Sequence, residues 1–236
     1  MMMTGSLKGD QRTKCLIPEW KYPNCASQAN EILSHIPTPE DWVLYREAYR
    51  RSVMDTAPEH FSLEPSTWAN GSATGFQVPI RVQYSPDDGR GIYAITDIPN
   101  NTLVWDNRFT ARIRNECEAR QFVLQELTAH QACNVILWGY AFDHGTGQLE
   151  WGIDLDPGTF LNKAPSSAEI NVEDRLVDRS LALEPGGHSM WSTRDIRAGE
   201  ELLSAYQDVH SCNPFKNLWW EVKLVWKSWG ISAVMF

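Results

Sequence analysis

The sequence has no apolar run long enough to cross a membrane. Its longest predominantly apolar stretch is 135–142, VILWGYAF, far shorter than the roughly 20 residues that span a bilayer. The first residues, MMMTGSLKGDQRTK, lack the apolar h-region of a secretory signal. We therefore expect neither a membrane partner nor secretion, and predict an intracellular protein, nuclear or cytoplasmic.

Cysteine is scarce, and its spacing matches no metal motif. The five cysteines are an odd number and include no CxxC pair. His130 and Cys133 would share a helix face, and His210 lies near Cys212, but neither pair makes a four-ligand zinc pattern. We therefore predict reduced thiols and no metal site.

Basic residues are outnumbered by acidic ones. The 21 Lys and Arg residues face 30 Asp and Glu residues, which gives a formal net charge of -9 and a pI of about 5.1. Long-range attraction then favours a basic partner and disfavours the phosphates of nucleic acid. A basic protein or peptide segment is the expected partner, without direct nucleic-acid binding. The oligomeric state is not predicted.

Residues 1–76 are predicted to form an N-terminal arm and a helical extension. The first thirty-odd residues are polar with scattered Pro, so we expect them to be irregular. Thr38 can then cap a helix that Pro39 opens. Apolar residues follow at helical spacing: Trp42, Tyr45, Tyr49 and Val53.

From Gln77 the period of the apolar residues changes to two, which predicts a strand. Tight turns separate this strand from IYAIT and TLVW, and the Pro-free, Gly-free segment 115–133 predicts a helix. Further strands are expected at 134–143, 148–155, 168–173, 179–184 and 188–196. The fold class is therefore mainly β with inserted and flanking helices (α+β). Residues 211–236 should form a Trp-rich helix that Asn213 caps and Pro214 opens.

One phrase occurs twice. Residues 95–104 read ITDIPNNTLV, and residues 193–202 read TRDIRAGEEL. Asn101 and Gly199 occupy the same place in the two copies, and Gly and Asn are the residues that best tolerate a positive φ. We infer that one β-turn-β device is used twice.

These phrases carry a family resemblance. GRGIYAITDIPNNTLV resembles the opening motif of the SET domain, the fold of protein-lysine methyltransferases, and WSTRDIRAGEELLSAY resembles its closing motif. GTFLNKAPSSAEIN lies where the family has Asn-His-Ser-Cys-x-Pro-Asn. The resemblance covers roughly residues 77–206, within a predicted SET-like domain at 77–210. It implies a SET-type β-clip of several small sheets with a pseudoknot-like C-terminal crossing.

The resemblance also implies the cofactor and the site. S-adenosyl-L-methionine would bind Gly89, Arg90, Gly91, Asn162 and Lys163, and Tyr206 would be the catalytic tyrosine. Aromatic rings suit a methyl-lysine channel because cations rest on ring faces. Candidates for this channel are Trp138, Tyr140 and one of Trp219, Trp220 or Trp226. The Trp-rich helix would take the place of the cysteine-rich post-SET segment, which this chain lacks.

Three departures from the family pattern leave two functions open. Lys163 replaces the family's His, Ala164-Pro165 replaces Ser-Cys, and Ala205 replaces the Asp before the closing Tyr. The first function is a lysine methyltransferase that acts on a basic protein or peptide segment, for example that of a histone. The second is an inactive SET-fold interaction module. An unrelated all-β protein with chance matches is the remaining alternative.

Overall fold

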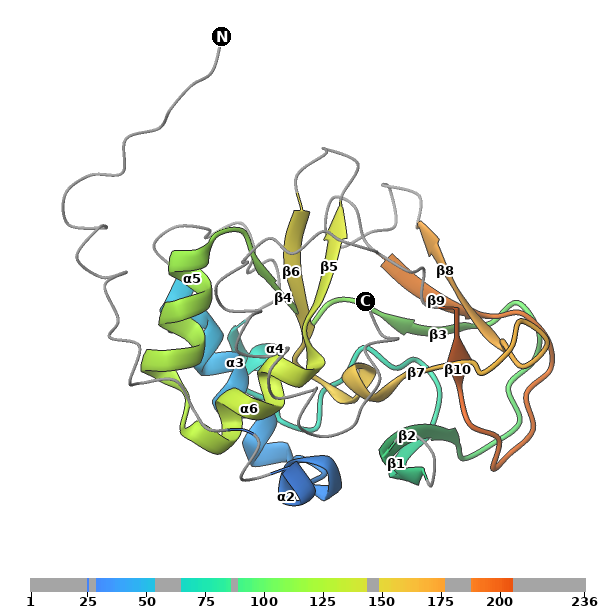
Figure 1. Ribbon diagram of the computed structural model, residues 1–236. Helices are drawn as coiled ribbons and strands as arrows, with labels where there is room; N and C mark the ends of the chain where they lie inside the picture. Colours follow the sequence, from blue (N-terminus) through green and yellow to red (C-terminus); the bar gives the residue numbers. More distant parts are fainter. Residues whose placement is uncertain are drawn as a thin grey trace, which may run out of the picture.

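Short strands form three small sheets, and most of the helices gather to one side of them (Figure 1). The computed structural model describes residues 25, 29–53, 65–85, 89–143, 149–176 and 188–205. This arrangement confirms the predicted mixture of helices and several small sheets. The predicted strand at 179–184 and the predicted helix within 211–236 lie outside the described residues, as do Tyr206 and Trp219.

Among the described residues, three α-helices precede the first sheet: α2 (Ala29–Ser34), α3 (Pro39–Val53) and α4 (Pro65–Trp68). The predicted cap of α3 is confirmed, because the Asp41 backbone N–H donates to the Thr38 hydroxyl (3.3 Å) and Asp41 accepts from the Thr38 backbone N–H (2.8 Å). The four residues of the predicted apolar stripe are all buried. The prediction of an irregular arm was wrong for residues 29–34, which form α2. This helix is too short to be stable alone, and it forms where Ile32 is fully buried.

The sheets have two, five and three strands. Strands β1 (Ile80–Ser85) and β2 (Gly89–Ala94) form an antiparallel hairpin. The five-stranded sheet has the order β3-β9-β8-β10-β7, with β3 (Leu103–Asp106), β9 (His188–Ser192), β8 (Val172–Leu176), β10 (Leu203–Ser204) and β7 (Asn162–Lys163). The third sheet has the order β4-β6-β5, with β4 (Thr110–Ile113), β6 (Leu149–Asp154) and β5 (Tyr140–Asp143). Strand β10 is parallel to both of its neighbours, so the last described strand enters between two earlier segments.

The helical insert differs from its prediction. It comprises α5 (Glu116–Arg120), the π-helical η4 (Gln121–Glu126) and α6 (Ala129–Trp138), and the 3-10 turn η5 (Pro157–Phe160) follows later. The single helix predicted at 115–133 breaks because Thr128 and Gln131 form a capping box that starts α6. The strand predicted at 134–143 was wrong for residues 134–138. Residues 135–138 are apolar at every position, so their periodicity does not separate helix from strand.

The two copies of the repeated phrase pair with each other. Asn101 has φ 60° and Gly199 has φ 89°, as predicted. Ile98 and Ile196 exchange backbone hydrogen bonds of 2.8 and 2.9 Å. The Asp of each phrase then accepts from the backbone of the other turn, Asp97 from Ala198 N–H and Asp195 from Asn100 N–H, both at 2.8 Å. The phrase occurs twice because each copy stabilises the turn of the other.

One hydrophobic core runs through the described segments and across the predicted domain boundary at residue 77. Arg46 of α3 is fully buried and donates to the carbonyls of Asn70, Ala73 and Leu155. Burial lowers the pKa of Arg46 to about 10, and the nearby Asp156 opposes this shift. The N-terminal helices are therefore built into the same core as the sheets.

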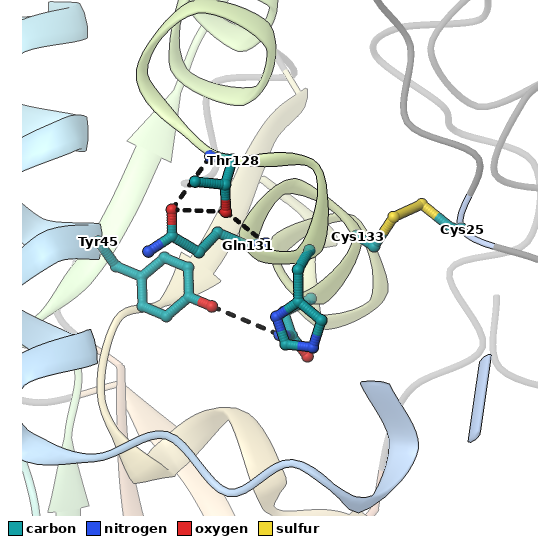
Figure 2. The surroundings of a disulfide bond; sticks show 7 residues. Cys25, Tyr45, Thr128, Gln131 and Cys133 are labelled. Atoms are coloured by element: carbon teal, nitrogen blue, oxygen red, sulfur yellow. Dashed lines mark hydrogen bonds between the residues drawn. A yellow bond between two sulfur atoms is a disulfide. The ribbon is translucent and has the colours of Figure 1, made fainter. Parts of the chain in front are cut away.

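The three cysteines in the described part of the chain are disulfide-bonded, so the prediction of reduced thiols was wrong for them. Cys25 is bonded to Cys133 of α6, with a Cα–Cα distance of 5.4 Å, and Cys117 is also disulfide-bonded. Figure 2 shows this bond on one side of α6, while Tyr45 reaches the helix from the other. Spacing did not reveal the pair because 108 residues separate the two cysteines.

In the described part of the chain, no helix is both long and apolar enough to span a bilayer.

Candidate functional site

The predicted glycine turn forms the start of β2. Gly89 has φ 84°, in the left-handed region, and pairs with Ser85 at the turn end of the hairpin. The other edge of β2 faces the second copy of the repeated phrase, through a Tyr93–Glu201 bridge and a Leu202 N–H bond of 2.7 Å to the Ile92 carbonyl. Strand β2 is therefore held between β1 and the closing motif at 191–206, which we call the closing phrase.

Asn162 connects the glycine turn with the closing phrase. Its Nδ2 donates to the Arg90 carbonyl (2.8 Å) and to Glu201 Oε1 (2.9 Å). Asn162 lies on β7, where it pairs with Leu203 of β10. The structure thus brings together Gly89–Gly91 and Asn162, which the sequence analysis placed in one site.

Glu201, which the sequence analysis did not single out, lies at the centre of this arrangement. Its Oε2 accepts from the Tyr93 hydroxyl at 3.0 Å. A Cβ on Gly91 would lie 2.1 Å from Glu201 Oε1 and 3.2 Å from Asn162 Nδ2. Only glycine at position 91 leaves room for this carboxylate. We call Gly91, Tyr93, Asn162 and Glu201 the carboxylate cluster; the available sequence signal was the second Glu of the closing GEEL.

Asn171 fixes the backbone beside the carboxylate cluster. It is 1% exposed, and its Nδ2 donates to the Glu201 carbonyl (2.7 Å) while its Oδ1 accepts from Leu203 N–H (2.8 Å). Its backbone N–H also donates to the Leu203 carbonyl. These bonds satisfy the hydrogen-bonding groups of the buried Asn171 amide and of the Glu201 and Leu203 backbone. They therefore hold Glu201 in position.

The Arg90 side chain does not belong to the carboxylate cluster. It is buried, donates to the His35 carbonyl (2.6 Å) and lies with Cζ 4.5 Å from the centre of the Phe160 ring. Burial lowers the pKa of Arg90 to about 10. Only its carbonyl faces Asn162. Lys163, the next residue along β7, is half-buried and pairs with Ser204 of β10.

The two described aromatic candidates lie in other surroundings. Trp138 is 7% exposed and its ring lies 5.6 Å from Trp42, 5.3 Å from Tyr45 and 5.6 Å from Phe160, measured between ring centres. The Tyr140 hydroxyl donates to Asp154 at 3.0 Å. Core packing explains the position of Trp138, and the hydrogen bond to Asp154 explains that of Tyr140. The role of both residues in a lysine channel stays a prediction.

The carboxylate cluster is rich in hydrogen-bond acceptors. It presents the Glu201 carboxylate and the Asn162 Oδ1, which accepts no hydrogen bond from the described residues. The Arg90 carbonyl lies beside them. Such a set suits a cationic ligand rather than an anion. Within the described ranges, no group of His, Cys, Asp and Glu side chains is arranged to hold a metal ion.

No protein-family model matches this chain. No curated protein matches it either. Among solved structures, it is similar to the crystal structure of a Plasmodium falciparum protein described as a candidate histone methyltransferase, at 18% identity and a TM-score of 0.38. The match covers 58% of this chain and 97% of that one. A likeness at this level carries no argument about fold or function.

Proposed function

We propose that the chain is an S-adenosylmethionine-dependent protein-lysine N-methyltransferase of the SET type that acts on a basic protein segment. One observation carries the proposal: Asn162 bonds to Arg90, 72 residues earlier, and to Glu201, 39 residues later. The three segments that resemble the opening, middle and closing motifs of the family therefore meet at one point.

The strand order supports the SET-type β-clip within this proposal. Strand β10 lies between β7 and β8 and is parallel to both. A chain that re-enters between two earlier strands agrees with the pseudoknot-like crossing that the family resemblance implies. Tyr206, the proposed catalytic residue, follows β10 by two residues in the sequence and lies outside the described residues.

The residues present fit the proposed cofactor. S-adenosylmethionine carries a sulfonium and an ammonium group, and the carboxylate cluster offers acceptors beside a glycine turn. Gly89 and Gly91 allow close approach to the backbone, and Asn162 holds this backbone to the closing phrase. The cofactor, when bound, supplies an activated methyl group. The chain contributes positioning, from which an in-line transfer gains most. We assign Tyr206 an orienting role, because a phenol of pKa about 10 is a poor base at neutral pH.

A second candidate is a SET-fold interaction module without catalysis. The departures favour it: Lys163 lies on β7 directly after Asn162, and Ala205 is exposed at the end of the closing phrase. A long charged side chain in place of His changes the chemistry beside the site even where the backbone contacts are kept.

Calorimetry and methyl transfer separate the two candidates. We expect the full chain to bind S-adenosylmethionine and to transfer its tritiated methyl group to histones or other basic proteins. Asn162→Ala should weaken cofactor binding, and Tyr206→Phe should lower transfer while keeping cofactor binding. Cofactor binding without transfer to any basic protein would support the module. Absence of cofactor binding at millimolar concentration would overturn the methyltransferase proposal.

A further inference from the structure

Glu201 is set apart from the other glutamates of the protein by what surrounds it. Every other buried or half-buried glutamate whose side chain the structure describes forms an ion pair with an arginine. These pairs are Glu47–Arg50, Glu118–Arg114, Glu126–Arg51, Glu150–Arg112 and Glu200–Arg194. Glu201 is half-buried, and the donors to its carboxylate in the part of the chain that the structure describes are both neutral, the Asn162 amide and the Tyr93 hydroxyl. Among the described residues, no cation pairs with it.

The surroundings also keep this carboxylate in place. The absence of a side chain at Gly91 gives it room, and the side-chain amide of Asn171 bonds to the backbone of Glu201 and Leu203 and so fixes the residue. A partly desolvated negative charge in a fixed position favours a positively charged group, and a charge-assisted hydrogen bond is about twice as strong as a neutral one. The glycine turn lies beside it on β2.

We infer that Glu201 binds the α-ammonium group at the methionine end of the cofactor. The inference rests on the proposed function and adds a residue to its site. Among the cations of this ligand, the ammonium is the one that donates hydrogen bonds, and the carboxylate retains acceptor capacity beyond its two neutral donors. S-adenosylhomocysteine keeps the ammonium and loses the sulfonium charge, so its binding depends on Glu201 as well.

The test compares S-adenosylhomocysteine with its analogue that lacks the α-amino group, by calorimetry on the full chain. The wild-type protein should bind the analogue about ten- to a hundredfold more weakly. Glu201→Gln should bind S-adenosylhomocysteine more weakly by a similar factor and should no longer distinguish the two ligands. Glu200→Gln is the matched control, because its neighbouring carboxylate pairs with Arg194, and it should keep the wild-type discrimination.

Several results would overturn the inference. If Glu201→Gln weakens both ligands equally, the residue has a structural role only. If it weakens S-adenosylmethionine but not S-adenosylhomocysteine, the carboxylate recognises the sulfonium instead. Should this variant fail to fold, the wild-type comparison still decides, since equal affinity for the two ligands excludes ammonium recognition. A wild-type protein that binds S-adenosylhomocysteine without this discrimination refutes the inference alone, whereas one that binds no cofactor refutes the proposed function as well.

Discussion

Asn101 and Gly199 show how a single backbone angle determines residue choice. Both have a positive φ in equivalent turns, and an added Cβ on Gly199 would meet nothing within 4 Å. The cost of substitution at Gly199 therefore comes from the backbone conformation and not from crowding. Asn tolerates the left-handed region better than other residues with a side chain.

We predict that Gly199→Asn is close to neutral and that Gly199→Ala lowers the free energy of unfolding by about 1 kcal/mol. Urea unfolding of the two variants measures this difference. The mirror exchange at the other turn, Asn101→Gly, is the control: it suits the backbone angle and should cost only what the exposed hydrogen bond from Arg175 to Asn101 Oδ1 contributes. Equal destabilisation by Asn and Ala at position 199 would contradict the conformational explanation.

The burial of the Asp156 carboxyl could not be predicted from the sequence. Asp156 is fully buried and accepts from the backbone N–H groups of Gly75 and Gly158 and from the Thr74 hydroxyl. Burial raises the pKa of Asp156, while these donors and Arg46 lower it. Gly158 is a local partner, but Thr74 and Gly75 lie 82 and 81 residues from Asp156 in sequence, so no local pattern predicts the whole network.

At the scale of elements, local signals predicted helix α3 and failed in the insert. The caps and the apolar stripe of α3 act within one segment, so the sequence contains all the information they need. Helix α6 begins with Ala129 and runs through the apolar residues 135–138, where only tertiary burial decides between helix and strand. Helix α2 is stabilised by a core that forms from later segments.

The disulfide between Cys25 and Cys133 joins the chain before α2 to helix α6. Closing a loop of this length restricts the unfolded chain, by about 4 to 5 kcal/mol in the chain-entropy model. We predict that Cys133→Ser lowers the unfolding free energy by a large part of this amount, measured by denaturant unfolding under non-reducing conditions.

The matched control is a double-mutant cycle. If the bond is the source of the stabilisation, Cys25→Ser costs about as much as Cys133→Ser, and the double variant costs little more than either. Additive losses would contradict this explanation. Disulfides persist mainly in oxidising compartments, so the predicted intracellular location can no longer rest on reduced thiols and stays a prediction.

At the scale of the whole molecule, the candidate site was partly predictable. The family resemblance of the opening and middle segments implied that Gly89–Gly91 and Asn162 share one site, and Asn162 bonds to the Arg90 carbonyl in the structure. Glu201 was missed because its importance depends on a bridge to Tyr93 across two segments 108 residues apart in sequence. The orientation of the Arg90 side chain, toward His35, likewise depends on where α2 packs.

The overall charge gives a prediction for the proposed substrate. With a formal net charge of -9, the protein should attract a Lys- and Arg-rich peptide through long-range electrostatics, which salt screens over a Debye length of about 10 Å at 0.1 M. We predict that its affinity for a basic histone-tail peptide falls several-fold between about 50 and 300 mM NaCl, as measured by fluorescence anisotropy. The same peptide with acetylated lysines is the control, and it should bind weakly with little dependence on salt. An affinity for the basic peptide that does not change with salt would show that shape or apolar contacts, and not the acidic surface, select the partner.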